Sequence, residues 1–205
     1  MSARNTSLTI CLSVAAIVAA VAVALVRAPE PAQGAATAVV GEVLVLGDSL
    51  AVGTMPYLDE MLPPEVNVTW DAVDGRTTPQ GIESLQFDLH EVEPQVVAVS
   101  LGSNDGPDPA RFTSRIRRLM HDLSPTTCVA WFSIVRPPRK GRYGGLNRAL
   151  RAEARRDPRL IVISWDHAVE RGAVRLPDGL HADAAGYRYR SSKIAQAVQS
   201  GCAAE

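Results

Sequence analysis

Apolar and polar positions change in blocks along residues 42–205, and the blocks predict alternating strands and helices. Short runs rich in apolar residues, typical of strands buried on both faces, lie at 43–46, 66–73, 96–101, 128–135 and 160–164. Apolar positions at helical spacing occupy 49–62, 78–89, 109–123, 146–156 and 183–199. This alternation predicts a three-layer α/β/α sandwich with a mainly parallel five-stranded sheet.

A different pattern precedes this domain. Residues 8–26 carry no charge over 19 residues, a length that nearly spans a hydrocarbon core of ~30 Å. We therefore expect residues 1–27 to form one N-terminal hydrophobic helix, either a membrane anchor or a signal peptide. The length favours a retained anchor, whereas the small residues Ala35, Ala36 and Ala38 leave cleavage open.

The segment after the apolar run sets the domain boundary. Residues 28–41 are rich in Pro, Ala and Gly and are expected to form a flexible linker, followed by a single domain at 42–205. With either fate of the N-terminal segment, this domain is expected outside the cytoplasm, attached to the membrane or secreted.

Composition and charge exclude several classes. Apolar residues make up 46% and charged residues 21%, which excludes a wholly disordered chain. The balance of 21 basic against 22 acidic residues gives no electrostatic case for nucleic acid. Without residues 1–27, which hold Arg4 and Arg27, 19 basic residues remain against 22 acidic ones. A charge near −3 suits a soluble ectodomain.

The cysteines and histidines indicate no metal site. No C-x-x-C, H-x-x-x-H or H-E-x-x-H spacing occurs, and we expect no metal and no cofactor. Cys128 begins a predicted strand and Cys202 follows the last predicted helix. Because helices run antiparallel to the strands in this topology, we expect a structural disulfide between them, opposite the candidate site.

Candidate chemistry follows the carboxyl ends of three predicted strands, where parallel sheets bind ligands. Ser49 lies at the first turn of a helix, where free backbone N–H groups favour negative charge. Gly75 lets a substrate approach a bare N–H, and the Asn104 amide is a neutral donor for an oxyanion. Taken singly, a helix cap explains Ser49 equally well, and a loop glycine and an Asx turn are the better explanations of Gly75 and Asn104.

Asp178 and His181 form a fourth group, in the loop before the last predicted helix. An aspartate three residues before a histidine can hold one ring nitrogen and leave the other to take a proton from Ser49. The pair alone also suits an acidic capping turn with a surface histidine. The occurrence of all four groups at one end of the sheet favours catalysis.

In this order the four groups resemble the motif blocks of the SGNH hydrolases, also called GDSL esterases and lipases. The matching residues are Gly47-Asp48-Ser49-Leu50, Gly75, Gly102 with Asn104, and Asp178 with His181, within a span of about 43–198. The resemblance implies a flavodoxin-like SGNH fold. The G-x-S-x-G elbow of α/β-hydrolases is absent.

The resemblance also implies a role for each matched residue. Ser49 is expected to be the nucleophile, His181 the general base and then acid, and Asp178 the carboxylate that orients His181. The backbone N–H groups of Ser49 and Gly75, with the Asn104 side chain, are expected to form the oxyanion hole.

Two further residues are weaker candidates for substrate binding. Arg136 follows the fourth predicted strand, and we expect it to line the cleft and meet an anionic or polar group. Asp48, the residue before Ser49, is the second candidate for a substrate contact.

These expectations add up to a serine esterase that removes short acyl groups from cell-envelope carbohydrate or lipid. One alternative is transfer of the acyl group to a cell-wall sugar hydroxyl, since residues 135–138 and 146–150 look like the exported domain of cell-wall O-acetyltransferases. Another is a lipid hydrolase of lysophospholipase or thioesterase type. The scarcity of aromatic residues favours a shallow site. The expected partners are the substrate and, through the N-terminal helix, the membrane; the oligomeric state is open, and we expect a monomer.

Overall fold

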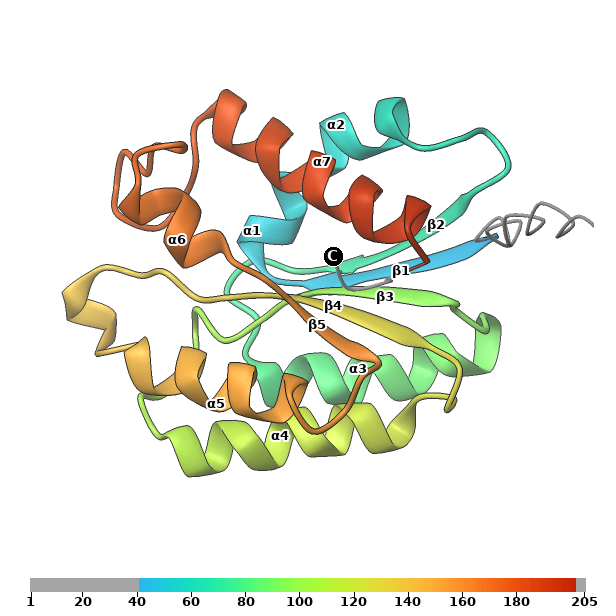
Figure 1. Ribbon diagram of the computed structural model, residues 1–205, viewed down its shortest axis with the longest axis horizontal. Helices are drawn as coiled ribbons and strands as arrows, with labels where there is room; N and C mark the ends of the chain where they lie inside the picture. Colours follow the sequence, from blue (N-terminus) through green and yellow to red (C-terminus); the bar gives the residue numbers. More distant parts are fainter. Residues whose placement is uncertain (1–40, 202–205) are drawn as a thin grey trace, which may run out of the picture. The chain divides into compact units, whose positions relative to one another are not determined.

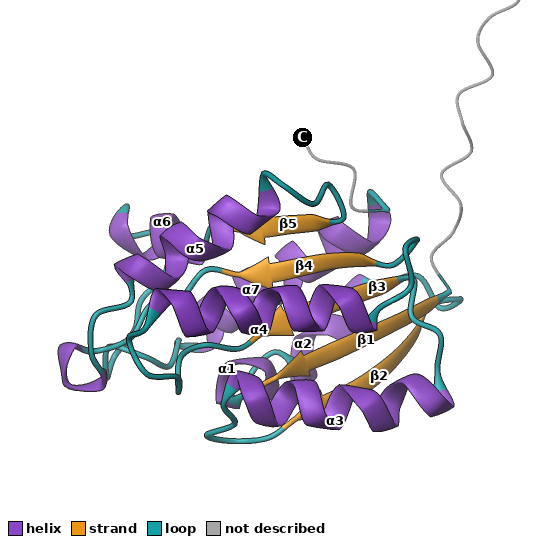
Figure 2. Cartoon of the chain, turned by 90° about the horizontal axis from the view of Figure 1, so that it is seen from below, coloured by secondary structure: helices purple, strands orange, loops and turns teal. Residues whose placement is uncertain are grey.

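The computed structural model describes residues 41–201, and a parallel sheet forms their centre. Its strands are β1 (Glu42–Gly47), β2 (Asn67–Ala72), β3 (Val96–Ser100), β4 (Cys128–Phe132) and β5 (Leu160–Ile163). They lie in the order β2-β1-β3-β4-β5, and each neighbouring pair is parallel (Figure 2). The predicted five-stranded parallel sheet is confirmed.

Helices cover both faces of the sheet (Figure 1). On one face lie α3 (Thr78–Glu91), α4 (Pro109–Asp122) and α5 (Gly144–Ala154). On the other lie α1 (Ser49–Val52), α2 (Met55–Leu58), α6 (Trp165–Glu170) and α7 (Ala184–Gln199). Two 3₁₀ turns, η1 (Asp59–Met61) and η2 (Pro138–Lys140), complete the elements.

Each face of the sheet buries its own apolar core. Leu44 and Leu46 of β1 pack towards α3, α4 and α5, whereas Val43 and Val45 pack towards the other helices. All four are at most 1% exposed. Because successive side chains of a strand point to opposite faces, a strand covered on both sides is apolar throughout. The outer strand β2 is only partly buried and more polar.

The helix expected at 49–62 is wrong as a single element. The chain forms α1, α2 and η1 there instead, with a break at Gly53 and Thr54. Gly53 lies against the ring of Tyr187 on α7, where a Cβ atom would stand 2.1 Å from the ring. The chain therefore bends where the first and last helices meet. The helix α6 has no counterpart among the expected elements.

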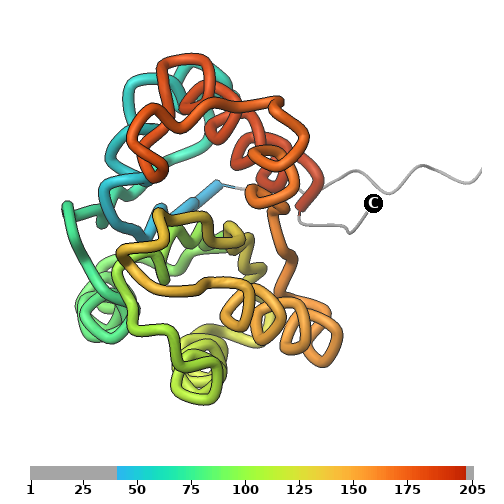
Figure 3. The backbone as a smooth tube through the Cα atoms, turned by 90° about the vertical axis from the view of Figure 1, so that its left-hand side faces the viewer, coloured from blue at the N-terminus to red at the C-terminus, as the bar shows by residue number. Residues whose placement is uncertain are grey.

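The carboxyl ends of all five strands lie at one end of the sheet, and Figure 3 faces that end. The loops at 73–77, 101–108 and 133–137 start there, as does α1. Cys128 begins β4 at the opposite end.

Several expectations fall on residues that are not described. The predicted N-terminal helix, nearly all of the linker and Cys202 lie outside residues 41–201, so the anchor or signal peptide and the Cys128–Cys202 disulfide stay predictions. Between residues 41 and 201, no helix combines the length and apolar character needed to cross a membrane.

Candidate active site

Ser49 and His181 come from opposite ends of the domain and meet above the sheet. Ser49 is the first residue of α1, two positions after the last residue of β1, and His181 lies in the loop before α7. Ser49 Oγ is 3.0 Å from His181 Nε2, although 132 positions separate the two residues. His181 Nδ1 lies 2.8 Å from Asp178 Oδ2. The structure thus brings together the three residues that were expected to act as a unit.

Asp178 fixes both the ring and the backbone of His181. Its Oδ1 accepts the backbone N–H groups of Leu180 and His181, at 2.9 and 2.7 Å. The hydrogen bond from the His181 ring, followed by these two backbone bonds, holds the pKa of Asp178 well below its ordinary value. Because an ionised carboxylate only accepts hydrogen bonds, we assign the ring proton to Nδ1. The lone pair of Nε2 then faces the Ser49 hydroxyl.

Asp48, the residue before Ser49, is buried, which does not fit the expected substrate contact. Its side chain is 0% exposed and caps α1 by accepting the Leu50 N–H at 2.9 Å. Burial raises the pKa of Asp48 to about 6, against the lowering effect of the Leu50 N–H and of Arg190. Its Oδ2 accepts a hydrogen bond from Asn104 Nδ2 at 3.3 Å. Asp48 therefore belongs to the support of the site.

The buried guanidinium of Arg190 lies near the Asp48 carboxyl group and favours its ionised form. Arg190 of α7 is 1% exposed and lies between the rings of Phe132 and Trp165, 3.9 and 4.6 Å from their centres. Its Nη2 donates to Ser100 Oγ at 2.8 Å, and Ser100 Oγ is 3.5 Å from Asp48 Oδ1. Within residues 41–201, its Nε and Nη1 have no hydrogen-bond partner. Burial lowers the pKa of Arg190 to about 10.

The two remaining candidate donors follow β2 and β3, the neighbours of β1 in the sheet. Gly75 has φ 74°, a left-handed conformation that favours glycine. Its neighbour Arg76 donates to the Asp71 carbonyl at 2.8 Å and pairs with the Asp71 carboxylate at 2.7 Å. Asn104 Nδ2 donates to the Arg76 carbonyl at 3.2 Å. The loops that carry Gly75 and Asn104 are therefore bonded to each other.

The oxygen of the Asn104 amide has a partner that the sequence analysis did not identify. Lys140 Nζ in η2 donates to Asn104 Oδ1 at 2.7 Å. The only feature of the sequence that sets Lys140 apart is that the chain has just two lysines. Nothing in its local sequence indicates this contact.

Arg136 is also buried, at 3% exposure, although it belongs to the lining of a cavity with Pro138 and Tyr143, and the expected substrate contact stays a prediction. Its guanidinium donates to the carbonyl oxygens of Gly102, Ser103 and Asp105 on the loop that carries Asn104. It donates as well to the carbonyls of residues 141 and 142 on its own loop. Burial lowers the pKa of Arg136 from its usual value. This side chain connects the loop that carries Asn104 to its own loop.

Gly102 at the start of the same loop has no room for a side chain. Its φ is 112°, and a Cβ atom would stand 2.4 Å from Ile134 Cδ1. At the other end of the loop, Asp105 accepts the Thr78 N–H at 2.8 Å and pairs with Arg115 at 2.7 Å. Asn104 is thus carried by a loop that is fixed on both sides.

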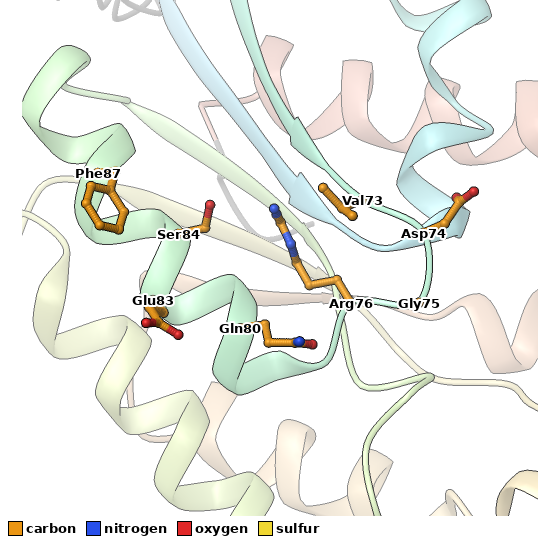
Figure 4. A pocket seen from close by; sticks show the side chains of 8 residues that line it. All are labelled: Val73, Asp74, Gly75, Arg76, Gln80, Glu83, Ser84 and Phe87. Carbon is orange, nitrogen blue, oxygen red and sulfur yellow. The ribbon is translucent and has the colours of Figure 1, made fainter.

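A cavity of about 390 Å³ opens beside Gly75, between the end of β2 and α3 (Figure 4). Its lining consists of Val73, Asp74, Gly75, Arg76, Gln80, Glu83, Ser84 and Phe87. Most of these side chains are polar, and Phe87 is 72% exposed. In the part of the chain that is described, no three His, Cys, Asp or Glu side chains gather as metal ligands.

Known proteins share both the sequence pattern and the fold. Residues 45–189 match the GDSL-like lipase/acylhydrolase family. An arylesterase from Vibrio mimicus is 25% identical over 158 residues, which are 68% of this chain and 79% of that protein. Thioesterase 1/protease 1/lysophospholipase L1 from Escherichia coli K12 is 28% identical over 112 residues, 49% of this chain and 53% of the relative.

Among solved structures, the C-terminal catalytic domain of peptidoglycan O-acetyltransferase A from Streptococcus pneumoniae has a similar fold. The TM-score is 0.64 at 21% identity, covering 78% of this chain and 93% of that domain. At this identity the likeness shows the fold alone. The family match spans most of the described residues, and the chain belongs to the GDSL-like lipase/acylhydrolase family.

Proposed function

We propose that this chain is an extracytoplasmic serine esterase that cleaves short acyl esters of cell-envelope carbohydrate or lipid. The observation that carries the proposal is the line of contacts from Ser49 Oγ through His181 to Asp178. Family membership and the arylesterase relative support ester hydrolysis. The location outside the cytoplasm rests on the uncharged run at residues 8–26.

Acylation begins when Ser49 Oγ attacks the ester carbonyl carbon and its proton passes to His181 Nε2. The carbonyl π electrons move to oxygen and leave a tetrahedral oxyanion. The imidazolium that forms is stabilised by the ionised Asp178 on Nδ1. When the intermediate collapses, Nε2 returns the proton to the leaving alcohol oxygen, and an acyl group remains on Ser49.

The oxyanion is bound by the backbone N–H groups of Ser49 and Gly75 and by Asn104 Nδ2. Ser49 is the first residue of α1, and the first N–H groups of a helix lack partners within the helix. Asn104 is held against the Gly75 loop by its bond to the Arg76 carbonyl. The two hydrogens of Asn104 Nδ2 bond to Asp48 Oδ2 and to the Arg76 carbonyl at 3.3 and 3.2 Å, so the oxyanion shares one of these hydrogens or displaces one of these long bonds.

Deacylation repeats these steps with water as the nucleophile. His181 Nε2 takes a proton from the water as its oxygen attacks the acyl carbon. The second tetrahedral anion collapses to the free acid, and Ser49 Oγ recovers its proton from Nε2. The residues named supply both half-reactions, and no metal or cofactor is part of the proposal.

The cavity beside Gly75 supports a polar group in the substrate. Asp74, Gln80 and Glu83 offer hydrogen-bond acceptors and a donor along its wall. The exposed Phe87 ring adds an apolar surface at its edge (Figure 4). Carbohydrate presents hydroxyl groups together with apolar C–H faces, so a glycan ester suits this lining better than a long acyl chain does.

Acyl transfer is the second candidate. It shares the acyl-enzyme on Ser49 but uses a sugar hydroxyl in place of water. The fold likeness to the pneumococcal O-acetyltransferase domain and the sequence at residues 135–138 and 146–150 favour it. An acyl donor would then have to come from a partner protein.

The test uses the purified chain with p-nitrophenyl esters from acetate to palmitate. We expect the shortest esters to be cleaved fastest and Ser49→Ala to be inactive. An organophosphonate should add one adduct to the wild type, located at Ser49 by mass spectrometry. Ser192→Ala, which removes an exposed hydroxyl from α7, is the matched control. Persistent turnover or labelling in Ser49→Ala would refute the proposal.

A glycan acceptor separates the two candidates. With acetylated donor ester and a peptidoglycan oligosaccharide present, a hydrolase releases acetate and leaves the oligosaccharide unmodified. Acetylated oligosaccharide that depends on Ser49 would favour the transferase.

A further inference from the structure

Lys140 reaches the candidate oxyanion hole from a loop outside the four motif blocks. It ends η2, in the connection between β4 and α5. Its Nζ donates to Asn104 Oδ1 at 2.7 Å, shorter than either hydrogen bond of the amide nitrogen. We propose that Lys140 is a positioning residue that orients and polarises the Asn104 amide for oxyanion binding. This inference rests on the proposed function.

The orientation argument follows from the symmetry of a carboxamide. The two ends of an asparagine amide have nearly the same shape, so hydrogen-bond partners decide which way it points. Here the nitrogen faces two acceptors, Asp48 Oδ2 and the Arg76 carbonyl. The oxygen faces the Lys140 ammonium, which can only donate. A flip of the amide would place donor against donor and acceptor against acceptor on the two sides.

The polarisation argument follows from the charge of the donor. A hydrogen bond from an ammonium is roughly twice as strong as one between neutral groups. It draws electron density towards Oδ1 and leaves the Nδ2 hydrogens more positive, since linked hydrogen bonds polarise one another. The Asn104 amide therefore presents stronger donors when Lys140 is bound to its oxygen.

Lys140 also offsets an unfavourable charge in the hole. Asp48 is buried and bonded to the same amide nitrogen, so a developing oxyanion forms near an existing carboxylate. Like charges at short range in a buried site repel strongly. The Lys140 cation acts on Asp48 as well and counts among the groups that favour its ionised form. A positive charge on the outer side of the amide reduces this repulsion.

Arg139 provides a matched control. It precedes Lys140 in η2, carries the same charge and is exposed to solvent. The hydrogen bond to Asn104 Oδ1 comes from Lys140 and not from Arg139. Replacing Arg139 changes the local net charge by the same amount and leaves the contact with the amide in place.

The experiment compares Lys140→Met, Lys140→Arg and Arg139→Met with the wild type on p-nitrophenyl acetate. The oxyanion develops only as the bound ester reacts, so the loss of a group that stabilises it lowers kcat and leaves KM nearly unchanged. We expect Lys140→Met to lower kcat roughly tenfold, a part of the effect of a whole oxyanion donor, with KM changed less than about twofold. Lys140→Arg should recover most of the loss, and Arg139→Met should equal the wild type.

A second readout uses phosphonylation of Ser49, in which negative charge develops on a phosphonyl oxygen that would occupy the same hole. The rate of inactivation by an organophosphonate should fall in Lys140→Met by the same factor as kcat and recover in Lys140→Arg. If Lys140→Met does not fold, as judged by thermal unfolding, Lys140→Gln takes its place, with a similar expected fall.

The outcomes separate this inference from the proposed function. A wild-type kcat in a folded Lys140→Met overturns the inference, as does an equal loss in Arg139→Met or a loss confined to KM. In each case Ser49→Ala remains inactive if the proposed function holds. Turnover that survives in Ser49→Ala would instead overturn the proposed function.

Discussion

Asp178 binds His181 at two places, the ring Nδ1 at 2.8 Å through Oδ2 and the backbone N–H at 2.7 Å through Oδ1. One carboxylate therefore sets both the position of the residue and the tautomer of its ring. The side chains of both residues are close to half exposed, at 49% and 43%. The orientation of the His181 ring is therefore set by these hydrogen bonds and not by burial of the pair.

The first prediction concerns that tautomer. Asp178→Asn keeps an oxygen for the backbone N–H groups but turns an N–H donor towards ring Nδ1. The ring then carries its proton on Nε2 and cannot accept one from Ser49. We expect kcat to fall by roughly 10³–10⁴ with KM little changed.

The check for this prediction is steady-state kinetics together with the nitrogen NMR shifts of the ring. Asp59→Asn, an exposed carboxyl in η1, is the control. Activity of Asp178→Asn within tenfold of the wild type would mean that the carboxylate does not set the tautomer.

The second prediction concerns Asn104. Asn104→Ala removes the one side-chain donor of the proposed hole and leaves its backbone donors. A single such donor is worth roughly 10²–10³ in kcat, with little effect on KM. The measurement is turnover of p-nitrophenyl acetate over a range of concentrations. Turnover equal to the wild type would remove Asn104 from the hole.

The third prediction uses the buried carboxyl of Asp48, whose pKa burial raises from 3.8 to about 6. The folded chain then binds this proton more tightly than the unfolded chain does. Wild-type stability therefore falls as the pH rises from about 4 through 6, and the loss is complete above the folded-state pKa. Two pKa units correspond to about 3 kcal/mol.

The neutral variant Asp48→Asn lacks this titration. We expect the free energy of unfolding of Asp48→Asn minus that of the wild type to increase by about 3 kcal/mol between pH 4 and pH 8. Urea unfolding at a series of pH values measures the difference. Any fixed cost of placing a second carboxamide beside Asn104 cancels in this trend. A difference that stays constant with pH would contradict the prediction.

The fourth prediction concerns Arg136, which donates to carbonyl groups of two loops. Arg136→Met leaves buried carbonyl oxygens without donors, and we expect the free energy of unfolding to fall by about 2–4 kcal/mol. Because the loop with Asn104 loses its support, kcat should fall as well. Arg148→Met, at an exposed position of α5, should change neither quantity. Unaltered stability of Arg136→Met would show that the loops hold without it.

The sequence predicted those parts of the fold that local pattern determines. A strand such as β3, buried at every position, must be apolar along its whole length, so Val96 to Val99 identify it. The meeting of Ser49 with His181 followed from the parallel sheet, whose strand ends lie together, and from the resemblance of the four motif blocks.

The sequence did not predict contacts that depend on distant packing. The residues around Arg136 do not indicate whether its guanidinium faces solvent or the loop at 102–105. The direction of this side chain depends on how the two loops pack in the folded chain. Gly53, in the break of the helix expected at 49–62, packs against Tyr187, which lies more than a hundred positions away. Lys140 was missed for the same reason, since its partner Asn104 is 36 positions away.

The wide separation of Ser49 from His181 has a consequence for how the protein is made. A chain that emerges from its N-terminus presents the hydroxyl early, yet the imidazole arrives only with the last quarter of the sequence. In the proposed mechanism, the nascent polypeptide has no base for Ser49 until α7 has packed against α2 and the loop with His181 is in place. Under the proposed function, a chain that ends before residue 181 would have no ester hydrolysis, and activity would begin only when synthesis is nearly complete.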